Sequence, residues 1–110
     1  MINISSISVK TGGDISTLDY TSSKSVLESI AKSLSKKCVT HNITFNAIRP
    51  GLIDTSIHDL NPKKDLGERI KTIRVGRIGQ PQRVSEIIVF LCSDNASFIT
   101  GNVIFVVGGE

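Results

Sequence analysis

Three short apolar segments alternate along the chain with stretches of helical periodicity, and this alternation constrains the fold more than any other feature. Residues 2–5 and 43–48 are short and β-rich, and Pro50-Gly51 is expected to end the second of them. Residues 103–107, "VIFVV", form a continuous apolar run typical of a strand covered on both faces. Parallel strands require crossover connections, which are right-handed and usually helical. The order therefore predicts an α/β fold with helices packed on a parallel sheet.

Helices are predicted in three places between these strands. From Asp19 to about Lys37, apolar residues recur at intervals of three and four positions, which indicates an amphipathic helix. Residues 65–75 carry a weaker pattern of the same kind. A third helix is expected to begin at Pro81, because the missing N–H of a proline costs no hydrogen bond in the first helical turn. The buried stripe of this helix is predicted to consist of Val84, Ile87, Ile88 and Leu91.

Size and composition narrow the class of protein. The 110 residues suffice for one small domain and not for two. An apolar content of 39% and a charged content of 21% are typical of a globular chain and not of a disordered one. No apolar run approaches the roughly 20 residues of a spanning helix, and the N-terminus lacks the pattern of a secretory signal. We therefore expect a cytoplasmic protein that does not enter a membrane.

Cysteine and histidine give no sign of a metal site. Cys38 and Cys92 do not form a Cys-x-x-Cys pair, and both lie in apolar helical patterns, so they are predicted to be buried free thiols. His41 and His58 are solitary and lie beside turn-like residues. We assign neither histidine a role and expect no bound metal.

Tyr20 and Lys24, in the segment "YTSSK", are the residues best suited to chemistry. Side chains four positions apart lie on one face of a helix, so both can reach one pocket. A free tyrosine loses its proton only near about pH 10, but a neighbouring ammonium stabilises the phenolate and makes it usable as an acid or base. Ser5 or Ser6 ends the first strand, and open α/β sheets bind ligands at strand ends. Taken alone, such a pair is more often a solvated lysine near an unrelated tyrosine.

Four motifs follow one another in the chain: "INISS", "YTSSK", "NAIRPGLIDT" and "GRIGQPQRVSEIIVFLCSDNASFITGNVIFVVGG". Together they resemble the C-terminal half of the short-chain dehydrogenase/reductase family, and the resemblance covers essentially the whole chain. It implies an incomplete Rossmann-like doubly wound parallel sheet, made of the last three strands with their flanking helices. Residues 1–110 would then be a single partial domain, the catalytic half of such a fold.

The resemblance also implies catalytic roles. Ser6 would hold and polarise the substrate oxygen, Tyr20 would transfer the proton, and Lys24 would bind the nicotinamide ribose while stabilising the phenolate. Ser5 or Ser8 is an alternative to Ser6, because the loop between the serine and the tyrosine is slightly longer than the family's usual one.

The segment "RPGLIDT" resembles the family's loop that closes against the nicotinamide. Pro50 and Gly51 would shape its turn, the backbone at Ile53 would meet the carboxamide, and Thr55 would contact the carboxamide or a phosphate. The implied cofactor is NAD or NADP, and the implied reaction is hydride exchange with a small carbonyl or alcohol substrate. Without the other motifs, this segment would be an ordinary strand-ending turn with Thr55 as a helix cap.

Some features of the family are missing. The Gly-rich turn that brings a helix N-terminus to the dinucleotide pyrophosphate is not found, since "KTGGD" at residues 10–14 does not fit Gly-x-Gly-x-x-Gly. Val107 stands where an acidic residue is usual in the family. The leading hypothesis is therefore a truncated NAD(P)-dependent oxidoreductase that forms homo-oligomers. The alternative is a noncatalytic remnant or a protein-interaction module of the same fold.

Basic residues are concentrated in one window. Seven of the thirteen Lys and Arg residues lie between Lys63 and Arg83, and residues 56–75 match the family's variable substrate lid. Lys63, Lys64 and Arg69 therefore raise the hypothesis of a substrate with an acidic or phosphorylated group, beside the equally good interpretation of a solvated face. "GRIG" resembles the loop with which KH domains bind nucleic acid. Low aromatic content and the wrong strand order make nucleic-acid binding the least favoured function.

Overall fold

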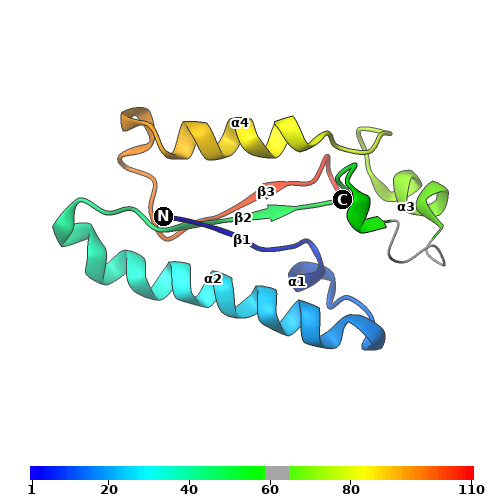
Figure 1. The fold of residues 1–110 in the computed structure, drawn as a ribbon, viewed down its shortest axis with the longest axis horizontal. Coiled ribbons are helices and arrows are strands. Elements are labelled where there is room, and N and C mark those ends of the chain that lie inside the picture. Colours follow the sequence, from blue (N-terminus) through cyan, green and yellow to red (C-terminus); the bar gives the residue numbers. More distant parts are fainter. Residues whose placement is uncertain (59–64) are drawn as a thin grey trace.

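A three-stranded parallel sheet forms the centre of the protein. The computed structural model describes residues 1–58 and 65–110. In it, strands β1 (Ile2–Ile4), β2 (Asn46–Pro50) and β3 (Val103–Val106) pair side by side in the order β1-β2-β3 (Figure 1). Both pairings are parallel. The predicted α/β fold with a parallel sheet is confirmed.

The central strand begins three residues later and ends two residues later than the sequence predicts. Its pairing with β3 continues to Pro50 opposite Val106, and Gly51 N then donates to Val106 O at 3.0 Å. Proline has no amide to donate, but the Pro50 carbonyl accepts from Ile7 N at 2.9 Å. The strand therefore runs up to the Pro-Gly turn, and the turn begins directly at the carboxyl end of the strand.

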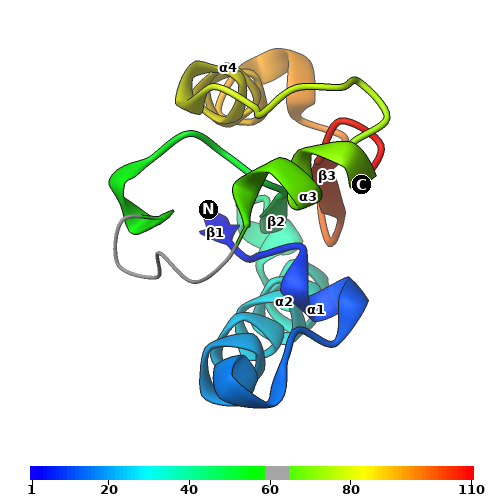
Figure 2. The same ribbon diagram turned by 90° about the vertical axis from the view of Figure 1, so that its right-hand side faces the viewer.

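One long helix covers each face of the sheet. Figures 1 and 2 show α2 (Leu18–Cys38) on one side and α4 (Pro81–Leu91) on the other. The two short helices α1 (Ser8–Thr11) and α3 (Leu66–Thr72) lie near the carboxyl ends of the strands. Three of these helices match the prediction, while α1 was expected to be loop.

The hydrophobic core lies between the sheet and α4. Ile48 of β2, Leu91 of α4 and Ala96 form its buried centre. The predicted stripe of α4 is confirmed, because Val84, Ile87 and Ile88 pack against this centre.

The opposite helix is less apolar where it meets the sheet. The buried residues of α2 are Glu28, Ala31 and Ser35, whereas its apolar residues Val26, Ile30 and Leu34 are 56%, 39% and 37% exposed. Within the described residues, β1 pairs only with β2. A contiguous apolar face of this kind is typical of a surface that contacts another chain or segment.

Two expectations about β3 and the cysteines are wrong. Phe105 of β3 is 45% exposed, so this strand is not covered on both faces. Cys92 is exposed and Cys38 is half-buried, which corrects the prediction of two buried thiols. Among the described residues, no helix is long and apolar enough to cross a membrane, and no cluster of three or more His, Cys, Asp or Glu side chains is arranged to hold a metal ion.

Candidate active site

All of the predicted site residues line one cavity at the carboxyl ends of β1 and β2. The cavity has a volume of about 1000 Å³. Its wall includes every residue assigned a catalytic or cofactor-binding role from the sequence: Ser6, Tyr20, Lys24, Pro50, Gly51, Ile53 and Thr55. Residues from three separate segments therefore meet at the end of the sheet where open α/β folds bind ligands.

A capping arrangement fixes the start of α2 and so the direction of its first turns. The Asp14 carboxylate accepts from Ser16 N at 2.9 Å, and Asp14 N donates to Thr17 Oγ1 at 3.0 Å. This reciprocal box begins a short 3₁₀ turn that continues into α2 at Leu18. The first residue of the helix is therefore fixed, and with it the positions of the side chains on its first turns beside the cavity.

Tyr20 and Lys24 lie one helical turn apart and face the same cavity. The Lys24 Nζ lies 5.6 Å from the centre of the Tyr20 ring, close enough for a cation–π contact. The same ammonium donates to the carbonyl oxygen of Ile4, the last residue of β1, at 3.0 Å. Lys24 thus spans from the helix to the strand end, while the Tyr20 side chain is partly open to solvent.

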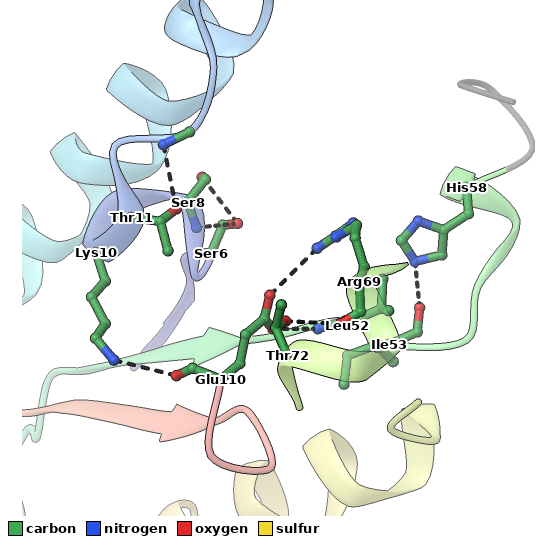
Figure 3. Close-up of polar contacts among 11 residues, drawn as sticks. Ser6, Ser8, Lys10, Thr11, Leu52, Ile53, His58, Arg69, Thr72 and Glu110 are labelled. Atoms are coloured by element: carbon green, nitrogen blue, oxygen red, sulfur yellow. Dashed lines mark hydrogen bonds and ion pairs between the residues drawn. The ribbon is translucent and has the colours of Figure 1, made fainter. Parts of the chain in front are cut away.

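The three candidate serines have different partners. Ser5 is buried, and its hydroxyl donates to Glu28 Oε1 at 2.6 Å. The Ser6 Oγ accepts from the backbone N of Ser8 at 3.2 Å and lies 3.1 Å from Ser8 Oγ, as Figure 3 shows. All three serines line the cavity, but the hydroxyl of Ser5 is already bound to Glu28, whereas Ser6 and Ser8 contact each other.

The segment after β2 is held by backbone pairing and one histidine. Ile53 forms a parallel bridge with Gly79, and His58 Nε2 lies 2.7 Å from Ile53 O (Figure 3). A carbonyl can only accept, so Nε2 of His58 carries the proton. Within residues 1–58 and 65–110, the Ile53 N–H donates to no protein acceptor.

The last glycine of the "GRIG" segment, residues 76–79, pairs with another part of the protein. Gly79 N donates to Leu52 O at 3.0 Å, and Asp54 N donates to Gly79 O at 2.8 Å. The backbone of the last glycine is therefore occupied by the loop that follows β2. This placement offers no support for the nucleic-acid interpretation.

A buried ion pair lies directly behind the cavity and joins its three segments. The Glu28 carboxylate of α2 accepts from Arg49 Nε at 2.8 Å, and its second oxygen accepts from Arg49 Nη2. Glu28 is one turn after Lys24, Arg49 precedes Pro50, and the third partner, Ser5, directly follows β1. The group therefore fixes the strand ends and the helix relative to one another.

The charge of this carboxylate is favoured by its partners. Burial raises the pKa of Glu28, but hydrogen bonds from Arg49 and Ser5, together with the nearby positive charges, outweigh burial and hold that pKa below its ordinary value of 4.5. Sequence reasoning did not identify Glu28, because positions 28 and 49 are 21 residues apart and nothing in the local pattern links them.

Glu110 is one of four acidic residues in the cavity wall, none of which was predicted as a site residue. The Glu110 carboxylate accepts from Leu52 N at 3.2 Å and lies 3.7 Å from an Arg69 nitrogen (Figure 3). Of the three basic residues proposed to contact an acidic substrate, Arg69 lines the cavity, while Lys63 and Lys64 lie outside the described residues.

The fold and the cavity define a class, Rossmann-like α/β proteins with a site at the strand carboxyl ends. The family described as Enoyl-(Acyl carrier protein) reductase matches residues 1–110. The chain is 37% identical over 109 residues to the 3-oxoacyl-(acyl-carrier-protein) reductase of Aquifex aeolicus, covering 99% of this chain and 44% of that protein. It is 40% identical over 111 residues to the acetoacetyl-CoA reductase of Rhizobium meliloti, covering 100% of this chain and 46% of that protein.

Solved structures agree with these relatives. The TT0495 protein of Thermus thermophilus superimposes with a TM-score of 0.89 at 28% identity, over 98% of this chain and 46% of that one. A short-chain dehydrogenase/reductase of Brucella melitensis, described as a glucose/ribitol dehydrogenase, gives 0.86 at 28% identity, over 98% of this chain and 43% of that one. The chain belongs to the short-chain dehydrogenase/reductase family. It spans less than half the length of the curated relatives it matches.

Proposed function

We propose that the chain supplies the catalytic half of an NAD(P)-dependent oxidoreductase, which exchanges hydride between a nicotinamide and a small carbonyl or alcohol. The observation that carries this proposal is the meeting of Tyr20, Lys24 and Ser6 in one cavity at the strand ends. Membership of a family of oxidoreductases supports it, as do the reductase names of the two relatives.

The side chains suit proton transfer at an oxygen atom. In the direction of reduction, the Tyr20 hydroxyl gives its proton to the oxygen of the substrate, and Lys24 stabilises the phenolate that remains. Ser6 donates a hydrogen bond to the same oxygen and so favours the negative charge that develops there. The nicotinamide supplies the hydride when it is bound.

The loop after β2 fits the nicotinamide carboxamide. The Ile53 N–H, which donates to no acceptor among the described residues, provides one donor in the cavity wall, and the Thr55 hydroxyl provides another group at the same edge. Pro50 and Gly51 bring the chain around to this position directly from the end of β2. Lys24, whose Nζ is already bound to a carbonyl acceptor, is placed to exchange that contact for the ribose hydroxyls.

The composition of the chain allows a direct binding test. Tyr20 is the single tyrosine and the chain contains no tryptophan, so its intrinsic tyrosine fluorescence reports from the proposed site alone. Titration with NADH and with NADPH should change this emission and enhance that of the nicotinamide. Lys24→Met should weaken both changes, while Lys36→Met, on the last turn of α2, serves as the matched control. The proposal fails if neither dinucleotide binds, or if Lys24→Met and Lys36→Met behave alike.

Activity gives the second test. Acetoacetyl-CoA is the first substrate to try because it is named in one relative, and oxidation of NADPH or NADH is followed by absorbance. Where turnover is found, Tyr20→Phe should lower kcat by about 10²–10⁴-fold, since it removes the proton donor.

A noncatalytic interaction module remains the second candidate function. The exposed apolar residues Val26, Ile30 and Leu34 of α2 favour it, because they form one stripe along the helix that the described residues leave open to solvent. Self-association through such a surface is also part of the leading proposal. Association without any dinucleotide binding would favour the module over the enzyme.

A further inference from the structure

We propose that the Leu52 amide, which Glu110 covers, and the cavity-lining Arg69 guanidinium form a carboxylate seat, which Glu110 occupies until a carboxylate of the substrate replaces it. The substrate assignment rests on the proposed function above, whereas the seat itself rests only on the contacts of these three residues.

The seat combines a fixed donor with a cation. Leu52 is buried, and its N–H points at the Glu110 carboxylate, with Oε2 at 3.2 Å. The Arg69 guanidinium approaches the other oxygen, Oε1, from helix α3 at 3.7 Å. A backbone N–H and a guanidinium are the groups that proteins commonly use to hold carboxylates. An internal carboxylate in this position shows that the seat accepts that chemical group.

A missing side chain makes room for the carboxylate. A Cβ atom at Gly51 would lie 2.7 Å from Glu110 Oε2 and 3.0 Å from Val107 Cα. Glycine is therefore required for a carboxylate to reach the Leu52 amide. The same glycine lies in the Pro-Gly turn assigned to the nicotinamide, so the seat and the proposed reaction site share one wall of the cavity.

The hold on Glu110 is incomplete, although its side chain is only 13% exposed. The bond from Leu52 is at the long end of the hydrogen-bond range, and the Arg69 contact exceeds it. A carboxylate has about four acceptor positions, and two donors of this quality satisfy them poorly. An incoming carboxylate that binds the two donors at shorter distances can therefore compete with Glu110.

The main chain of Glu110 is held apart from its carboxylate. Lys10 Nζ donates to the main-chain oxygen of Glu110 at 3.3 Å, so this contact does not depend on the side chain that occupies the seat (Figure 3). Gly108 and Gly109 precede Glu110 with φ of 61° and 87°, values that other residues rarely adopt. Gly108 O accepts from Val75 N at 3.0 Å and Glu110 N donates to Val107 O at 3.2 Å, which hold this backbone in place. The carboxylate therefore leaves the seat by rotation of the Glu110 side chain about its own bonds.

The test follows the seat directly by NMR of the 110-residue chain. Acetoacetate and its neutral methyl ester are titrated at matched ionic strength, and the Leu52 amide and Arg69 Nε–H resonances are observed. Acetoacetate should shift both resonances, and the ester should shift neither. Glu110→Ala empties the seat and should tighten acetoacetate binding by about tenfold, the scale of one charge-assisted hydrogen bond. Arg69→Gln should remove the binding.

Controls separate this inference from the proposed function. Glu110→Gln retains an oxygen acceptor without the charge and should give an intermediate affinity. Tyr20→Phe should leave the shifts at Leu52 and Arg69 intact, because neither seat contact involves Tyr20. Equal binding by the wild type and Glu110→Ala, equal binding of acid and ester, or binding of inorganic phosphate without acetoacetate would each overturn the seat. A failed dinucleotide titration alone would overturn only the oxidoreductase proposal.

Discussion

The buried pair formed by Glu28 and Arg49 should be a major contributor to the stability of this chain. Both side chains are nearly inaccessible to solvent, at 7% for Glu28 and 11% for Arg49. Removing one partner of a buried pair leaves the other charge uncompensated, which costs about 3–5 kcal/mol. Glu28→Gln keeps the shape and one acceptor oxygen, so we expect a loss at the lower end, about 3 kcal/mol. Domains of this size have a total stability of roughly 5–15 kcal/mol.

Urea unfolding followed by far-UV circular dichroism measures this loss. With a slope of about 1.5 kcal/mol per M, a loss of about 3 kcal/mol lowers the midpoint by roughly 2 M. Glu86→Gln is the matched control, because Glu86 pairs with Arg83 on the exposed face of α4 and such pairs contribute about 0–1 kcal/mol. The double variant Glu28→Leu, Arg49→Met should recover most of the lost free energy of unfolding, since apolar residues of similar size leave no uncompensated charge.

The same variant makes a prediction about pH. The pKa of Glu28 is lower in the folded chain than its ordinary value of 4.5, so its contribution is fully present above that value. It is lost as the pH falls through the lower, folded-state pKa. The difference in stability between wild type and Glu28→Gln should therefore be largest near neutral pH and shrink on acidification. A Glu28→Gln loss no larger than that of Glu86→Gln, or one independent of pH, would refute the reasoning.

Three other substitutions test single contacts. Gly51→Ala places a Cβ 3.0 Å from the backbone Cα of Val107, which cannot rotate away, so urea unfolding should show a loss of about 1–3 kcal/mol; no loss would contradict the close approach. Among the described residues, the buried Thr21 hydroxyl has no hydrogen-bond partner, so Thr21→Val should raise the urea-derived free energy of unfolding by about 1 kcal/mol; an unchanged value would mean that the hydroxyl is satisfied. Phe98 is fully exposed, so Phe98→Ser should lower the self-associated fraction in sedimentation velocity without loss of stability; an unchanged fraction would exclude this surface from the contact.

The fold was largely predictable because it depends on patterns that are local in the sequence. The leading proline placed the start of α4 correctly at Pro81, and the apolar period placed its buried stripe. The end of β2 was placed too early, because proline usually terminates a strand and the carbonyl of Pro50 was not foreseen as an acceptor for Ile7. Periodicity also could not tell which helix face meets the sheet, and on α2 the face toward the sheet holds Glu28.

The candidate site was predicted in part for the same reason. Tyr20 and Lys24 are four positions apart, so helical geometry alone brings them together. Glu110 reaches the cavity from the other end of the chain, through contacts that only the folded sheet creates. Long-range partners of this kind leave no mark in the spacing of residues. The assignment of Ser6 over Ser8 also depends on substrate geometry and stays a prediction.

The order of strands in the sheet has a consequence for how the chain is made. The described strands β1, β2 and β3 lie side by side in the order in which they are synthesised, so none of these three has to enter between the other two. The unit β1–α2–β2, with the ion pair between Arg49 and Glu28, is complete once residue 50 has left the ribosome. β3 can then pair with β2, which is already folded against α2 when β3 is synthesised.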